Sequence, residues 1–132
     1  MGSPVIWGGN KTSKNLQDNI NFADKVTKRH QEFSAANNQA SAANVTGLDL
    51  AGFRGAAIEL TVDIQATSDL FAKFRLEAVQ KNGAWQLTQE HLGDETNINF
   101  SITAAGQIQY TSGNEAGFTS STFKWEASLM GQ

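Results

Sequence analysis

The sequence contains no cysteine and only one proline. Without cysteine the chain cannot form a disulfide framework or a cysteine zinc site, so its stability has to come from a hydrophobic core. The single proline, Pro4, lies far from every segment that we expect to be a strand. This position agrees with a paired β-sheet, because proline cannot donate a hydrogen bond to a neighbouring strand.

Charge and long apolar runs are also scarce. Charged residues make up 17% of the 132 residues, and the formal net charge is −3. No basic cluster is larger than Lys28–His30, so we expect no nucleic-acid partner, because phosphate binding depends on concentrated positive charge. No apolar run approaches the ~20 residues of a membrane helix, which predicts no membrane insertion. The start, MGSPVIWGGNK, lacks the basic and apolar regions that would predict a signal peptide.

Groups that carry out chemistry are equally rare. The two histidines, His30 and His91, are far apart and have no partner at metal-ligand spacing. The segment GDETN, 93–97, offers oxygen ligands for calcium but lacks the EF-hand spacing, and an ordinary acidic turn is the simpler interpretation. No nucleophile elbow, phosphate loop or converging set of titratable groups is visible. The sequence therefore predicts no catalytic residue, no metal and no cofactor, and hence no enzyme.

The sequence is rich, by contrast, in strict alternation of apolar and polar side chains. In AAIELTVDIQA, 56–66, every second residue from Ile58 to Ile64 is apolar. The segments 71–80 and 84–90 flank Asn82-Gly83, a dipeptide that favours the tight turn of a β-hairpin. Alternation of this kind predicts strands with one buried face and one solvent-exposed face.

Similar patterns continue to the end of the chain. A second hairpin is predicted in INFSITAAGQIQYTS, 98–112, and further strands in 43–52 and 121–130. So many short antiparallel strands predict an all-β fold, an antiparallel β-sandwich of jelly-roll type with an N-terminal extension. The expected buried side chains are Ile58, Leu60, Val62, Phe74, Leu76, Trp85, Ile98, Phe100, Ile102, Phe123 and Trp125.

The first 35 residues follow a different pattern. KNLQDNINFADKVTKRHQEF, 14–33, has apolar residues at roughly helical spacing, but its asparagines are poor helix formers. We interpret 1–35 as an N-terminal arm with at most one short helix, joined to a sandwich at 36–132. The alternative, which stays open here, is that the arm packs on its own domain's core. An exposed arm would present its apolar residues to partner subunits. These are Val5, Ile6, Trp7, Leu16, Ile20, Phe22, Val26 and Phe33.

Four segments of the sandwich region carry a resemblance to a known family. They are NNQASAANVTGLDL (37–50), FRGAAIELTVDI (53–64), GAWQLTQEHLGDETNINFSITAAGQIQYTS (83–112) and STFKWEAS (121–128). In this order they resemble a small β domain that recurs in virion proteins of tailed bacteriophages, at the C-terminal end of tail fibres and other structural proteins. The hairpin Gln107–Ser112 is the most specific piece. Members of the family tend to carry an arginine at the end of the strand that contains Ile58 and Glu59, and this chain has DIQATSD, 63–69, there instead. The resemblance does not reach residues 1–33.

The resemblance implies a virion component, assembled in the cytoplasm of the host bacterium, that acts through contacts and brings no catalytic residues. We prefer a fibre-like or capsid-decorating structural protein, and a carbohydrate-binding or receptor-binding module at a tail tip is the alternative. A hydrolase such as a depolymerase is disfavoured because the sequence offers no acid pair. The implied partners are further copies of the chain as a homotrimer, other virion proteins, and a host-surface glycan.

Overall fold

The structure, a computed structural model, describes residues 25–131 of the chain. Within this range the chain forms eight β-strands and no helix, which confirms the predicted all-β class. The strands are β1 (Lys25–Ser34), β2 (Ala43–Asp49), β3 (Phe53–Gln65), β4 (Leu70–Lys81), β5 (Ala84–Gly93), β6 (Asn99–Ile102), β7 (Gln107–Thr111) and β8 (Ser120–Gly131).

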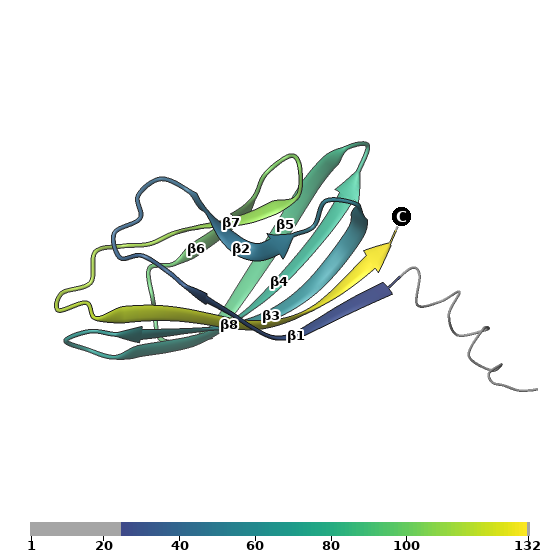
Figure 1. Cartoon of the computed structure of the whole chain (residues 1–132). Helices are drawn as coiled ribbons and strands as arrows, with labels where there is room; N and C mark the ends of the chain where they lie inside the picture. The colour runs from purple at the N-terminus through teal and green to yellow at the C-terminus, as the bar shows by residue number, and fades with distance from the viewer. Residues whose placement is uncertain (1–24, 132) are drawn as a thin grey trace, which may run out of the picture.

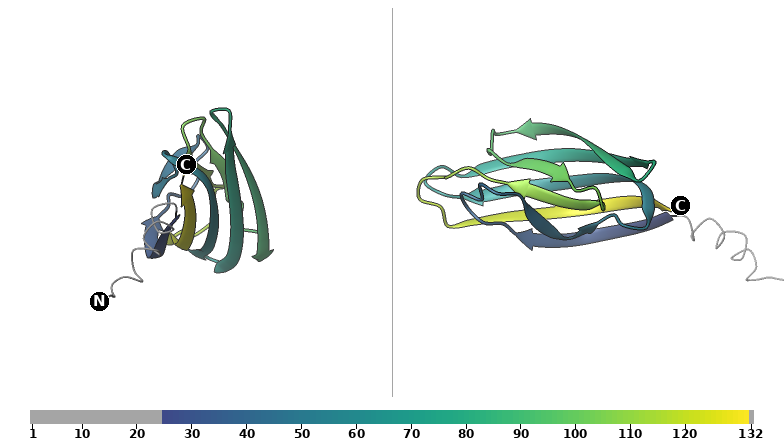
Figure 2. Two further views of the ribbon diagram at one scale, coloured as in Figure 1. Left: turned by 90° about the vertical axis from the view of Figure 1, so that its right-hand side faces the viewer. Right: turned by 90° about the horizontal axis from the view of Figure 1, so that it is seen from above.

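The strands form two sheets that face each other (Figures 1 and 2). The larger sheet has the order β1-β8-β3-β4-β5, and the smaller has the order β2-β7-β6. Every strand pair is antiparallel. The first and last strands, β1 and β8, are neighbours in the larger sheet, and β2 and β7 are neighbours in the smaller one. The predicted antiparallel sandwich is therefore confirmed, with its strands divided five and three.

The alternation seen in the sequence corresponds to one buried face on each long strand. In β3, β4 and β8, buried and more exposed side chains alternate along most of the strand. Ten of the eleven side chains expected in the core are buried, with at most 9% of their surface exposed. The eleventh, Ile102, is partly buried against the same core. The register of the sandwich is therefore the one that the hydrophobic pattern dictates.

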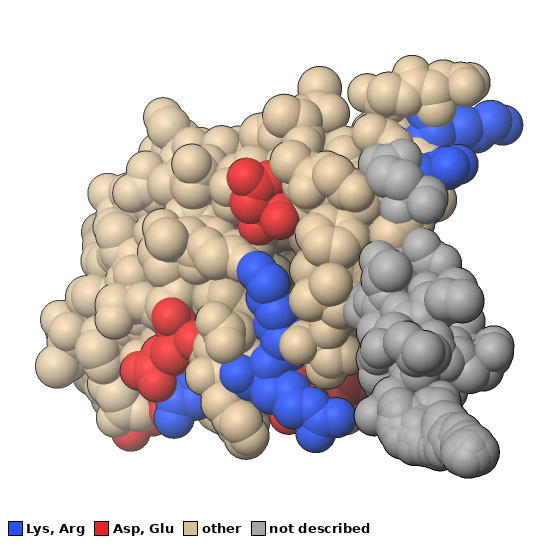
Figure 3. Space-filling view, turned by 45° about the vertical axis from the view of Figure 1, so that its right-hand side comes forward, with Lys and Arg blue, Asp and Glu red and all other residues tan. Residues whose placement is uncertain are grey.

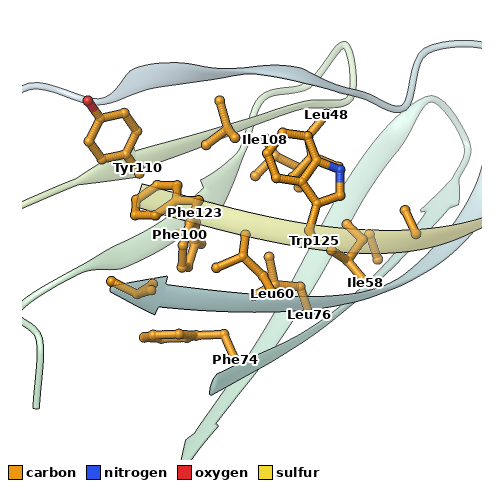
Figure 4. Packing of buried hydrophobic residues seen from close by; sticks show 14 of the residues in the cluster. Leu48, Ile58, Leu60, Phe74, Leu76, Phe100, Ile108, Tyr110, Phe123 and Trp125 are labelled. Atoms are coloured by element: carbon orange, nitrogen blue, oxygen red, sulfur yellow. The ribbon is translucent and has the colours of Figure 1, made fainter. Parts of the chain in front are cut away.

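Aromatic rings from both sheets meet at the centre of this core (Figure 4). The ring centroid of Phe123 on β8 lies 5.4 Å from that of Phe100 on β6 and 5.3 Å from that of Tyr110 on β7. Phe100 in turn lies 5.1 Å from Phe74 on β4. These pairs meet edge to face, a geometry that adds about 0.5–1.5 kcal/mol per pair beyond the burial of apolar surface. They join the two sheets directly.

The predicted hairpin around Asn82-Gly83 is present, and its second strand is longer than expected. Both turn residues have positive φ, 55° and 77°, as the tight two-residue turn requires. β5 continues to Gly93, three residues beyond the predicted end of this strand at residue 90. Sequence alternation stops earlier because the side chains of β5 beyond Leu87 are exposed on both faces.

β1 corrects the predicted domain boundary. We expected an arm up to residue 35, but Lys25–Ser34 pair with β8 and belong to the larger sheet. The ring of Phe33 lies 5.7 Å from that of Tyr110 and 5.9 Å from that of Phe123, so it covers its own domain's core. For this part of the expected arm, the alternative of packing on its own domain is the correct one. Residues 1–24 lie outside the described range, and so does most of the expected helix.

The two ends of the sandwich differ in what they carry. Four loops meet at one end: those between β1 and β2, β3 and β4, β5 and β6, and β7 and β8 (Figure 1). The start of β1 and the end of β8 lie at the opposite end, where Lys25 pairs with Met130. The described chain therefore enters and leaves at one end and presents a cluster of loops at the other.

Candidate functional site

An open groove of about 510 Å³ lies on the outer face of the five-stranded sheet, the face turned away from the core. It runs from β1 across β8 and β3 to β4. Polar and charged side chains dominate its lining, among them Glu32, Glu59, Thr61, Lys73, Lys124 and Glu126. None of these residues is among the candidate site residues that the sequence suggested.

A β-bulge in β1 forms one side of the groove. Between Lys28 and Gln31 the strand has two residues, Arg29 and His30, opposite the single Glu126 of β8. His30 has a φ of 57°, in the left-handed region that most side chains avoid. Bulges bend a strand and re-aim its side chains, and they are common next to binding sites.

The strand register sets the order of charges across the groove. Thr61 on β3 pairs with Lys124 on β8 and with Lys73 on β4, so the two ammonium groups flank a hydroxyl. In the neighbouring row, Glu59 lies directly opposite Glu126. Like charges directly opposite each other on neighbouring strands destabilise a sheet. The groove therefore presents a row of donors beside a pair of acceptors.

Only one of the two opposed carboxylates is neutralised. Lys73 Nζ lies 3.4 Å from Glu59 Oε1, and Arg75 lies 3.9 Å from Glu59 Oε2. These side chains are about half exposed, and such pairs are worth at most about 1 kcal/mol. Within residues 25–131, neither Glu126 nor Lys124 makes an ion pair. On the face shown in Figure 3, charges of both signs form small groups on a mostly uncharged surface.

The opposed carboxylates do not resemble a hydrolytic acid pair. A glycosidase needs one carboxyl group that an enclosed, apolar environment keeps protonated. Glu59 is engaged by Lys73 and Arg75, and Glu126 is exposed on an open sheet face. We find no enclosed set of titratable groups in the described part of the chain. The groove is an open surface that offers hydrogen-bond donors and acceptors from several strands.

The side chains of the acidic segment 93–97, considered above as a calcium loop, form hydrogen bonds with nearby residues. The Phe71 N–H donates to Asp94 Oδ2, and the Asn97 N–H donates to Glu95 Oε1. The side-chain amide of Asn97 donates to Glu115, in the loop between β7 and β8. Among residues 25–131 no group of three or more His, Cys, Asp or Glu side chains is arranged to hold a metal ion. The hydrogen bonds therefore favour the interpretation as an acidic turn.

The segment Gln107–Ser112, which begins with β7, has a structural role in this chain. The side-chain amide of Gln107 donates to the carbonyls of Val45, Leu48 and Ile108, at 3.1, 3.2 and 2.8 Å. The first two carbonyls belong to β2, whose pairing with β7 shifts register between Asn44 and Asp49. The Gln107 side chain thus supplies hydrogen bonds to β2 where the regular pairing with β7 is interrupted.

Two further residues of the same hairpin bind the loop between β1 and β2. Tyr110 Oη accepts a hydrogen bond of 2.8 Å from the Ala36 N–H, and Ser112 Oγ donates to the Ala36 carbonyl at 2.7 Å. Ser112 Oγ also accepts from the Gln39 N–H at 2.8 Å. The segment Gln107–Ser112 therefore fixes the connection between the two sheets through side-chain hydrogen bonds.

Of the partner-contact residues suggested by the sequence, two can be placed. Phe33 is partly buried against the core, and Val26 is 38% exposed on β1. The other six lie outside the described residues: Val5, Ile6, Trp7, Leu16, Ile20 and Phe22. The expected arm surface is thus reduced to residues 1–24. In the described part of the chain, no helix is long and apolar enough to cross a membrane.

Comparison with known proteins finds a similar fold among solved structures. No protein-family model and no curated protein sequence matches the chain. Among solved structures, the chain is similar to the tailspike protein gp49 of Acinetobacter baumannii bacteriophage Fri1, a capsular polysaccharide depolymerase. The TM-score is 0.50 and the identity 9%, over 98% of this chain and 24% of that one.

The tailspike protein of Acinetobacter phage vB_ApiP_P1 also matches, with a TM-score of 0.42 and 15% identity, over 81% of this chain and 21% of that one. The fold is similar to part of a phage tailspike protein. The chain spans about a quarter of the length of the tailspikes it matches, and at these identities the likeness concerns the fold alone.

Proposed function

We propose that the chain is a non-enzymatic domain of a bacteriophage tail protein, of fibre or spike type, that acts through contacts with other macromolecules. The observation that carries the proposal is the likeness in fold to the Fri1 tailspike, which extends over 98% of this chain. The sequence resemblance to virion domains points the same way. The open sheet face, without an enclosed set of titratable groups, supports binding over catalysis.

The location in the particle is tested by electron microscopy of purified phage labelled with an antibody against this chain. We expect the label on the tail. Label on the head would support the capsid-decorating alternative, and unlabelled particles would overturn the proposal. The non-enzymatic part is tested by incubating the purified protein with capsular polysaccharides and measuring reducing ends. We expect none above background, and sustained release would show a depolymerase.

We also propose that the protein assembles as a homotrimer, with residues 1–24 in contact with neighbouring subunits or another virion protein. The apolar residues of this segment and the open edges of both sheets support assembly, since unpaired strand edges favour association. Light scattering coupled to size exclusion measures the mass. Three times the mass of one chain is expected, and a monomer at micromolar concentration would contradict the proposal.

A second candidate function, glycan binding, is favoured by one side chain. Phe71 is an aromatic residue at the loop end of β4, and 55% of its surface is exposed. It lies on the same outer face as the groove, two residues along β4 from Lys73. Sugar-binding sites commonly combine an exposed apolar ring with a few convergent polar groups. A tail domain with such a surface would contribute to host attachment.

A further inference from the structure

We propose that the groove at the β1 bulge binds a segment of an uncharged glycan, with Glu126 and Lys124 as its main polar contacts. This inference deepens the glycan-binding candidate and rests on it, but it does not depend on where the protein sits in a particle. It assigns the binding site to one face of the sandwich and the ligand to one chemical class.

The balance of charge in the groove selects the ligand class. Its lining includes three carboxylates, Glu32, Glu59 and Glu126, and two ammonium groups, Lys73 and Lys124. A polyanion would be repelled by the carboxylates and a cation by the lysines, while the two apolar residues of the lining, Leu60 and Trp125, are buried in the core. A hydroxyl group, in contrast, both donates and accepts, so it can bind to either kind of side chain. A chain of hydroxyl-rich rings is therefore the ligand that this lining fits.

The spacing of the charged groups also suits such a ligand. Lys124, Thr61 and Lys73 follow one another across three neighbouring strands, which lie ~4.8 Å apart. Glu126 and Glu59 form the adjacent row, two residues further along the same strands. A row of donors thus lies beside a pair of acceptors on the floor of the groove. A sugar ring, which carries hydroxyls around its edge, can contact both rows at once.

Two unfavourable local features coincide in this groove. Glu59 faces Glu126 across neighbouring strands, and a β-bulge places His30 at positive φ beside them. Each feature lowers the stability of the fold, and unfavourable features of this kind are commonly found at functional sites. Because Glu126 and Lys124 make no ion pair within the described residues, both are available to a ligand.

The test starts with the full chain on an array of purified bacterial capsular polysaccharides and O-antigens, with both neutral and acidic repeats. Affinity for each bound polysaccharide is then measured for Glu126→Gln and Lys124→Met. Glu126→Gln removes the acceptor charge and also relieves the repulsion from Glu59, so it should melt no lower than the parent. Loss of binding in this variant therefore cannot be attributed to unfolding.

Matched controls come from the same sheet outside the groove. Glu77→Gln and Lys81→Met change exposed charges on β4 that do not line it. We expect neutral-repeat polysaccharides to bind, and each groove variant to lose at least roughly tenfold in affinity, as expected for one hydrogen bond to a charged group. Both controls should stay within about twofold of the parent, well inside the effect of one such bond.

Three results would overturn the inference in distinguishable ways. Binding that is unchanged by the groove variants would move the site elsewhere and leave the glycan-binding candidate standing. Binding only to acidic repeats would refute the uncharged ligand class. No binding to any polysaccharide on the array would refute both the groove and the glycan-binding candidate, while the tail assignment would still depend on the particle microscopy alone.

Discussion

Single aromatic residues join the two sheets, and Phe100 is the clearest case. It is 5% exposed, and its ring contacts two rings of the larger sheet, Phe74 on β4 and Phe123 on β8. We expect Phe100→Ala to lower the free energy of unfolding by about 3–5 kcal/mol, because it removes apolar surface and leaves a cavity between the sheets. Urea denaturation followed by tryptophan fluorescence measures this change.

Phe71 provides the control for this measurement. The residue type is the same, but 55% of its surface is exposed on the outer face. Phe71→Ala should change the free energy of unfolding by no more than about 0.5 kcal/mol, as is usual at the surface. Equal losses in the two variants would mean that the core does not lie between these sheets.

Two glutamines on β7 allow a similar comparison for polar groups. Gln107 donates to three main-chain carbonyls, whereas Gln109 donates only to the side chain of Asn44 on the surface. Gln107→Ala leaves partly buried carbonyls without a partner, and we expect a loss of about 1–3 kcal/mol. Gln109→Ala should cost less than about 0.5 kcal/mol. If the two variants unfold at the same urea concentration, the irregular stretch of β2 does not depend on Gln107.

At the scale of elements, strands with unbroken alternation were predictable and irregular ones were not. β3, β4 and β8 show strict alternation because one face of each strand packs on the core and the other is turned away from it. The alternation does not reveal β1 for two reasons. Its bulge breaks the period of two, so that the inward positions are Val26 and Lys28 before the bulge and Gln31 and Phe33 after it. Two of these four side chains are also polar. The second half of β5 was missed because its side chains are exposed on both faces.

The groove could not be predicted for the same reason. It depends on which residues of β3, β4 and β8 stand opposite one another, and on a bulge in a strand that the sequence pattern did not reveal. Register between strands distant in sequence is a property of the folded chain, and alternation alone leaves it open. Glu59 and Glu126 look like ordinary solvent-facing residues until the ladder places them side by side.

The loop between β5 and β6 yields a prediction about metal dependence. Asp94 and Glu95 each accept a hydrogen bond from a main-chain N–H, so their oxygens already stabilise the turn. Dialysis against EDTA should leave the melting temperature unchanged within about 1 °C, since a metal that binds only the folded state would add stability that rises with the logarithm of its concentration. A clear decrease that calcium reverses would show that this loop is a metal site after all.

At the scale of the whole molecule, the two sheets define the unit that should fold alone. All eight strands lie within residues 25–131, and both the first and the last strand complete the larger sheet. We expect a fragment beginning at residue 25 to unfold cooperatively, as a single domain of this size usually does. Its melting temperature, followed by circular dichroism, should be close to that of the full chain.

A second fragment, beginning at residue 35, supplies the matched control. It lacks β1, so the edge of β8 is unpaired and the rings of Phe123 and Tyr110 lose their contact with Phe33. The unpaired edge of β8 and the newly exposed core side chains would favour aggregation. We therefore expect this fragment to be insoluble or unfolded. If it folds as well as the longer fragment, β1 is dispensable and the boundary predicted from the sequence was nearer the truth.

The longer fragment also tests how the protein assembles. If residues 1–24 make the contacts between subunits, the fragment beginning at residue 25 should remain folded but have the mass of one chain in light scattering, while the full chain has the mass of a trimer. A fragment that is folded and still trimeric would place the interface on the sandwich itself. The open edges of β1 and β5 would then be the first surfaces to examine, because within the larger sheet only these two strands have a single neighbour.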